Sequence, residues 1–127
     1  MATTRRPGWG LDDDRGQAAV EFAVALPIIV IAMLAIAQVG VAVRNEVAVE
    51  LAAREGARAA AVSADPAAAS AAARRAVGLP LDVAVSVDAT TVTVTVTYVD
   101  PTDIAIIGAA IGPVTHTASA TMAIEPP

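Results

Sequence analysis

The stretch DRGQAAVEFAVALPIIVIAMLAIAQVGVAV, Asp14 to Val43, decides the fold of this 127-residue chain. Its last 22 residues, Phe22 to Val43, contain no charged side chain. At a rise of about 1.5 Å per residue, a helix of this length crosses the ~30 Å hydrocarbon core of a bilayer. The remaining chain is too small to enclose a helix that is apolar on every face. The sequence therefore predicts a transmembrane helix.

Two residues interrupt the pattern of an ordinary membrane helix. Glu21 directly precedes the charge-free run, and a carboxylate near a bilayer is costly unless it is paired. Pro27 lies six residues further on, where it removes one backbone hydrogen bond and bends or loosens the helix. Prolines are also accepted as kinks in membrane helices, so Pro27 alone does not indicate a function.

Composition and charge exclude several classes of function. The net charge is −5, with eight basic and thirteen acidic residues, whereas a nucleic-acid-binding protein requires a basic surface. The chain has no cysteine, and its one histidine, His116, lies in a threonine-rich segment where we expect an ordinary strand residue. Neither a zinc site nor a histidine-based catalytic triad can be assembled. We therefore expect no enzyme activity, cofactor, metal or small-molecule substrate.

Helical signals continue beyond the membrane run over residues 44–77. Residues 44–62 are rich in Ala, Glu and Arg, so one helix from about Gln17 to Val62 is predicted, roughly 69 Å long. Asp65 and Pro66 are placed as N-cap and first residue of a second helix that ends at Gly78. The apolar stripe expected on the first helix consists of Val43, Val47, Leu51 and Val62.

A period of two begins at Leu81 and predicts strands. Alternation of valine with polar or small residues indicates a hairpin of strands over residues 81–88 and 91–99, and a third strand over residues 114–125. The apolar link before the third strand is expected to hold at most one helical turn. A three-stranded antiparallel sheet must cover one face, and the alanine-rich helices are available to cover it. The predicted fold class is therefore α+β.

The segment Arg15-Gly16-Gln17-Ala18-Ala19-Val20-Glu21-Phe22, followed by an apolar run with an early proline, resembles the leader of type IV pilins. More closely, the chain resembles the TadE-like family of small pseudopilins from tight-adherence pilus systems. The pieces that carry this resemblance are RGQAAVEFAVALP, AAREGARAAA, the Thr/Val strand and the closing ASATMAIE.

This resemblance implies processing and assembly. A prepilin peptidase is expected to cut between Gly16 and Gln17, which makes Glu21 the fifth residue of the mature chain. The implied parts are a leader over residues 1–16, a transmembrane helix over 17–43 and an extracytoplasmic head over 44–127, helical over 44–77 and β-rich over 81–125. Expected partners are the membrane, the peptidase, other pilin-like subunits and the assembly platform.

Individual residues receive roles from the same resemblance. Glu21 and Phe22 are assembly and recognition residues, and Pro27 either eases extraction from the bilayer or is a tolerated kink. Gln17 stands where many major pilins have an N-methylated Phe, so the resemblance does not decide whether it is methylated. The candidate small-residue positions for helix packing are Ala32, Gly40, Ala52, Gly56 and Ala60.

Two alternatives remain open from the residues. The first is a secretory signal that is cut before Gln38, after Ala35-Ile36-Ala37, and that releases a small binding module. The second is an uncut, single-pass anchor that never assembles. Basic residues on the two sides of the membrane run are nearly balanced, so charge does not fix the orientation of the helix. An N-terminus in the cytoplasm follows from the resemblance only.

Overall fold

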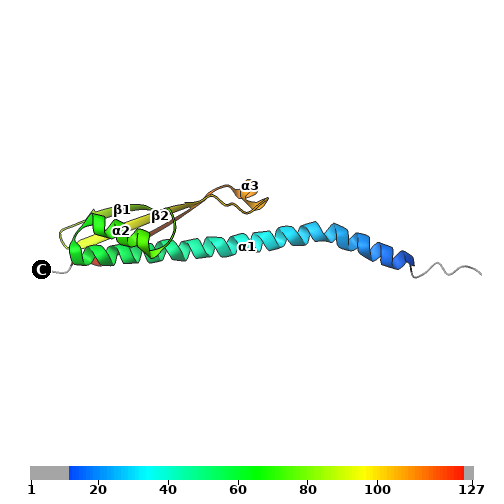
Figure 1. Cartoon of the computed structure of the whole chain (residues 1–127), viewed down its shortest axis with the longest axis horizontal. Coiled ribbons are helices and arrows are strands. Elements are labelled where there is room, and N and C mark those ends of the chain that lie inside the picture. Colours follow the sequence, from blue (N-terminus) through cyan, green and yellow to red (C-terminus); the bar gives the residue numbers. More distant parts are fainter. Residues whose placement is uncertain (1–11, 125–127) are drawn as a thin grey trace, which may run out of the picture.

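The computed structural model describes residues 12–124, and side chains from residue 16 onward. A long helix carries a small head at its C-terminal end (Figure 1). A long apolar helix, a second helix and a three-stranded antiparallel sheet confirm the predicted α+β class. The elements are α1 (Asp12–Ser63), α2 (Pro66–Ala76), β1 (Asp82–Val87), β2 (Thr91–Asp100), α3 (Ile107–Ile111) and β3 (Val114–Ala123).

Helix α1 contains 52 residues, which corresponds to a length of about 78 Å. It begins at Asp12, before the predicted start near Gln17, and acidic residues such as Asp12 to Asp14 favour a helix N-terminus. The helix continues through Pro27 without a break. Its blue N-terminal part changes direction (Figure 1), as expected where a proline removes one bond of the helical ladder. Most of the predicted leader, residues 1–11, lies outside the described residues.

Helix α2 begins where the sequence predicts it to begin. The Ala67 backbone N–H donates a 2.8 Å hydrogen bond to Oδ1 of Asp65, and Pro66 is the first helical residue. The helix ends at Ala76 with Arg74 and Arg75 in its last turn, where positive charge favours the helix dipole. The capping signals therefore fixed the direction in which the chain turns back along α1.

The sheet has the strand order β1-β2-β3, and both pairs are antiparallel. Val92, Val94 and Val96 of β2 are fully buried on one face of the sheet. The opposite face carries threonine and serine hydroxyls that bond across the strands, with Thr93 to Thr121 at 2.8 Å and Thr95 to Ser119 at 2.7 Å. The alternation predicted from the sequence is confirmed, and the described third strand ends at Ala123.

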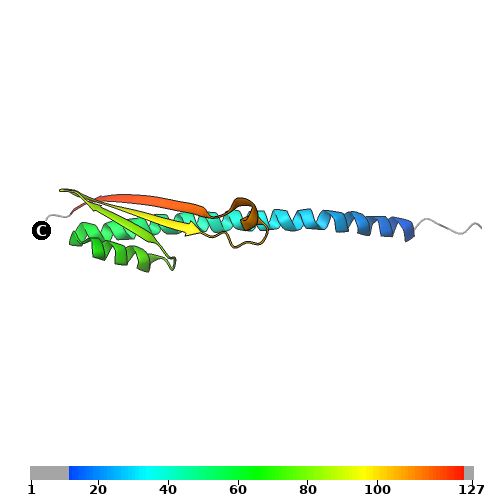
Figure 2. The ribbon, with the colours of Figure 1, turned by 90° about the horizontal axis from the view of Figure 1, so that it is seen from above.

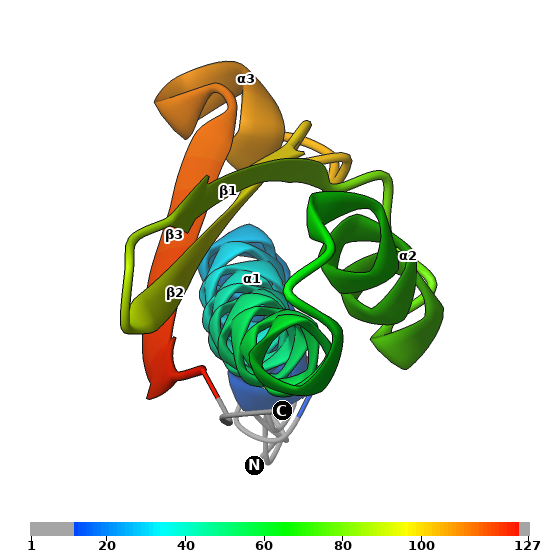
Figure 3. The ribbon, with the colours of Figure 1, turned by 90° about the vertical axis from the view of Figure 1, so that its left-hand side faces the viewer.

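The core forms where α1 and α2 lie side by side against one face of the sheet (Figure 3). The view from above shows the strands running along the C-terminal part of α1 (Figure 2). Small side chains let the backbones approach closely: a Cβ at Gly56 would lie 3.1 Å from the Ala69 carbonyl oxygen and 3.1 Å from Cγ1 of Val94. The buried apolar residues are Val49, Ala52, Ala53, Ala57, Ala60, Ala61, Ala69, Ala73, Leu81, Val92, Val94 and Val96.

The larger apolar residues of the expected α1 stripe lie outside the head core. Val43, Val47 and Val62 are about 60% exposed or more, and Leu51 is 45% exposed. The sheet and α2 instead cover the alanine-rich face around Val49 and Gly56. Alanine on this face gives the closer backbone approach, and the larger apolar residues are left on the outside of the helix.

Candidate assembly site along α1

The residues singled out by the leader resemblance lie together at the N-terminal end of α1. Gly16, Gln17, Glu21 and Phe22 are all exposed. The side-chain amide of Gln17 donates a 3.1 Å hydrogen bond from Nε2 to Oε1 of Glu21, one helical turn further on. The carboxylate is therefore directed back along the helix toward Gln17, where a cut after Gly16 would create a new amine.

The space around Gly16 is open. A Cβ built at this position would meet no described atom within 4 Å, and the residue is helical. Glycine is destabilising in a helix relative to alanine, and no close contact here requires it. No described contact of the fold therefore requires glycine at position 16.

The segment that follows can cross a membrane by its length and composition. The helix from Gly16 to Ser63 contains a strongly apolar segment, and no part of this segment is buried against the rest of the chain. Phe22, Val24 and Ile28, each more than 60% exposed, are typical of this surface. Such exposure of large apolar side chains requires a lipid or protein environment.

One exposed row of apolar residues runs from the membrane segment onto the head. We call this row the outer stripe; its members recur every three or four residues and therefore share one face of α1. Gly40 lies within it, and a Cβ there would meet no described atom within 4 Å. Gly56 faces the opposite way, into the head core against α2. The outer stripe consists of Ile36, Val39, Val43, Val47 and Leu51.

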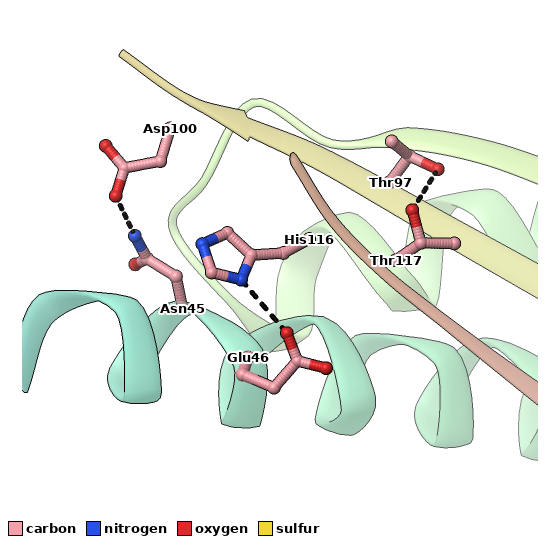
Figure 4. A network of polar contacts seen from close by, with 6 residues as sticks. All are labelled: Asn45, Glu46, Thr97, Asp100, His116 and Thr117. Carbon is pink, nitrogen blue, oxygen red and sulfur yellow. Dashed lines mark hydrogen bonds and ion pairs between the residues drawn. The ribbon is translucent and has the colours of Figure 1, made fainter. Parts of the chain in front are cut away.

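Buried polar contacts tie the head to α1 just beyond the membrane run (Figure 4). The Asn45 amide donates a 2.7 Å hydrogen bond from Nδ2 to Oδ2 of Asp100, and both residues are buried. Oδ1 of Asp100 accepts a second bond, 2.9 Å long, from the Thr102 backbone N–H. Two donors therefore satisfy the carboxylate at the end of β2.

A second contact joins the third strand to α1. Nδ1 of His116 lies 2.9 Å from Oε2 of Glu46, and its ring stacks on Tyr98 with centroids 6.4 Å apart. Because a carboxylate can only accept, the proton of this bond belongs to Nδ1. Nε2 of His116 is buried without a hydrogen-bond partner among the described residues. His116 thus holds β3 against α1, a role that its position in the sequence did not reveal.

The sequence gives no signal for these junction contacts. Asn45 and Asp100 are 55 residues apart, and Glu46 and His116 are 70 apart. The alternation of inward and outward residues along a strand places Asp100 and His116 on the inward faces of their strands. It does not identify the residues of α1 that they contact. Among residues 16–124, whose side chains the structure describes, no group of three or more His, Asp or Glu side chains could hold a metal ion.

Comparison with known proteins supports the resemblance to the TadE-like family. Residues 16–58 match the model of a family described as TadE-like protein. The match begins at Gly16, covers the membrane run and ends at residue 58 within α1, so it spans about a third of the chain. Searches of curated proteins and of solved structures each found no match.

The match and the fold agree with one class of protein. A TadE-like segment on an apolar, membrane-capable N-terminal helix fits a pilin-like protein of a tight-adherence system. This confirms the family resemblance stated from the sequence.

Proposed function

We propose that this chain is a minor pilin-like subunit of a tight-adherence assembly or secretion system. A prepilin peptidase cuts it between Gly16 and Gln17, and α1 then carries it into the assembly. One observation above all supports the proposal: the family match begins at Gly16, and Glu21 is directed toward Gln17. The role is structural, and it involves no chemical turnover.

The electrostatic logic begins with the cut. Removal of residues 1–16 leaves a cationic amine on Gln17 at the membrane edge, close to an exposed carboxylate on the same helix. In an assembly, Glu21 of one subunit meets the amine of a neighbouring subunit. Each charge then neutralises the other, and the pair fixes the axial register of the two helices, as a buried polar group does in a coiled coil.

The outer stripe supplies the packing surface for this arrangement. Its members remain largely exposed from Ile36 in the membrane segment to Val47, and Leu51, beside the head, is 45% exposed. Gly40 within it permits close approach of a second helix, as small residues do in membrane helix pairs. The TadE-like match spans the same residues.

The orientation follows from the processing step. The peptidase removes the leader on the cytoplasmic side, so the head lies on the extracytoplasmic side after a single crossing. Pro27 bends α1 within the membrane and lowers the helical stability there, which eases withdrawal of the subunit from the bilayer.

Replacement of Glu21 separates this function from a simple membrane anchor. In cells that assemble the system, Glu21→Gln should be cut normally but should be lost from the assembled fraction, because the pairing charge is gone. Glu50→Gln is the matched control, since Glu50 is also exposed on α1 but pairs with Arg54 at 3.1 Å. Equal recovery of both variants in assemblies would contradict the proposal.

Replacement of Gly16 tests recognition by the peptidase. Gly16→Leu is expected to leave the fold intact, because the added side chain meets open space, but the precursor should accumulate uncut. Gly40→Ala adds a methyl group to an equally open position of the same helix and should be cut like the wild type. Normal cleavage of Gly16→Leu would contradict the assigned cut site.

A further inference from the structure

The connection between β2 and β3 is unusually apolar for a loop. We call residues 104–113, Ile104 to Pro113, the apolar loop; they include α3 and contain no charged side chain. Ile106 and Ile111 are 59% and 58% exposed. Loops that face water are ordinarily polar, and exposed apolar surface of this kind marks an interaction site.

The position of this loop along α1 is fixed by the junction contacts. The β2–β3 ladder ends at the pair Asp100 and Val114, and Asp100 bonds to Asn45. From this level the apolar loop projects past the end of the strands toward the N-terminal half of α1, and α3 packs beside the cyan part of the helix (Figures 1 and 2).

This placement overlaps with the membrane run. On α1, the side chains of Leu34 and Ala35 are half-buried, and Gln38 is only 6% exposed. The rest of the chain therefore already covers part of the helix surface at these residues. The charge-free run extends to Val43, nine residues beyond Leu34. A bilayer that covers the run to its end therefore also meets the apolar loop.

A charged residue borders both the membrane run and the apolar loop on the side of the head. Arg44 follows the membrane run on α1, and Asp103 precedes the apolar loop; both are exposed. The two apolar segments thus end at one level, set by the bond between Asn45 and Asp100. A bilayer surface at this level leaves every described charged group of the head in water.

The backbone of the apolar loop is strained at Ile106, whose side chain is exposed. Ile106 has φ 71° and ψ −50°, and the Ile107 N–H donates a 2.8 Å bond to the Ala105 carbonyl, which together define a γ-turn with positive φ. This conformation is strained for a β-branched residue. The Ile106 side chain is not buried within its own chain, so burial in the head does not offset the strain. We therefore expect the side chain to contact an apolar surface outside the chain.

We infer that the apolar loop is a second membrane-contacting element, inserted into the outer leaflet beside α1, which holds the head down on the lipid surface. This inference rests on the proposed function in that α1 spans the bilayer. Within the membrane run, Gln38 is buried by the rest of the chain, and its two amide atoms have no partner among the described residues. The occupant of the exposed loop surface is lipid and not a second protein.

Single-cysteine labelling of the full chain tests this inference, because the chain has no native cysteine. Ala109→Cys in the loop, Ala32→Cys in the membrane run and Ser119→Cys on the outer sheet face each replace an exposed small residue. Each variant is labelled with an environment-sensitive dye and reconstituted in phosphatidylcholine–phosphatidylglycerol vesicles. Some of the lipids carry a nitroxide quencher near the top of the acyl chain.

The expected result is a blue-shifted emission and a loss of fluorescence to the nitroxide lipids for Ala109→Cys and Ala32→Cys, with neither effect for Ser119→Cys. Addition of Ile111→Asp to Ala109→Cys should abolish both effects at the loop, whereas addition of Val62→Asp, an exposed site on the far end of α1, should not.

Two results would overturn the inference and can be told apart. If Ala32→Cys is quenched but Ala109→Cys behaves like Ser119→Cys, the loop is outside the lipid while the membrane-spanning helix stands. If Ala32→Cys is not quenched either, α1 does not insert, and the proposed function fails together with the inference.

Discussion

At the scale of single residues, two carboxylates stand in opposite environments. Asp100 is buried and accepts bonds from the Asn45 amide and the Thr102 backbone. Glu21 is exposed and accepts one bond from the Gln17 amide. A buried charge requires its partners within the chain, whereas an exposed one near a membrane is free to take a partner from elsewhere. The first stabilises the head, and the second is available for assembly.

Asn45→Ala should lower the free energy of unfolding of the head by about 1.5–3 kcal/mol, because it leaves one oxygen of a buried carboxylate without its donor. Denaturant titration of the full chain in detergent, followed by circular dichroism of the sheet, measures the change. Glu46→Ala is the comparison: its partner is His116, but half of the Glu46 side chain is exposed, so the loss should stay below about 1 kcal/mol. Equal effects of the two variants would contradict this ranking.

Gly56→Val should destabilise the head by about 1–3 kcal/mol through overpacking, because even a Cβ at this position would press on the Ala69 carbonyl and on Val94. Gly78→Ala is the matched control, since a Cβ there meets no described atom within 4 Å. Thermal unfolding of the two variants in the same detergent distinguishes them. A Gly56→Val protein as stable as Gly78→Ala would show that α1 and α2 do not pack as described.

At the scale of elements, the strands were predictable and the orientation of α1 was not. Val92, Val94 and Val96 alternate with threonine, and this period directly indicates which side faces the core. Along residues 44–62, alanine occurs on every face of the helix, so the sequence pattern does not indicate which face packs against the sheet and α2. The core instead selected the small residues, because close backbone packing needs them.

The candidate site was predictable in part for the same reason. The leader-like segment is short and continuous in sequence, so its resemblance to type IV pilin leaders was enough to propose roles for Gly16, Gln17 and Glu21. The junction pairs join segments far apart in sequence, and no local pattern specifies which inward polar residues will meet. Asn45, for example, gives no sign in the sequence that its partner is Asp100.

Pro27→Ala should strengthen α1 within the membrane run. The substitution restores a backbone N–H that can donate to the Ala23 carbonyl, so helix bonds near residue 27 should open less often. Hydrogen exchange of the full chain in detergent should become slower around residues 24–31, with no change in the buried helix face around Ala57. Unchanged exchange near residue 27 would show that Pro27 does not loosen the helix.

At the scale of the whole molecule, the chain divides into a rod and a head with different surfaces. The head covers one face of α1 and leaves the outer stripe open, so the helix can contact the head and a neighbouring helix at the same time. The apolar loop and the membrane run end at the same level, marked by Arg44 and Asp103. Under the proposed function and the inference drawn from the apolar loop, these features would set the height of the subunit relative to the bilayer before it assembles.

Gly40→Leu should reduce assembly without unfolding the head. The added side chain meets no described atom of its own chain but would obstruct the approach of a second helix to the outer stripe. The amount of the variant in purified assemblies measures the effect, and the denaturant midpoint of the isolated chain serves as the control. Wild-type assembly by Gly40→Leu would exclude the outer stripe as the packing surface.

Mass spectrometry of the native protein tests the central claim most directly. In cells with an active prepilin peptidase, the account predicts an N-terminus at Gln17, so that a free amine lies beside Glu21. An intact chain that begins at Met1 would contradict it, because the pairing amine would never form. An N-terminus at Gln38 would contradict it as well, since Glu21 would then be removed.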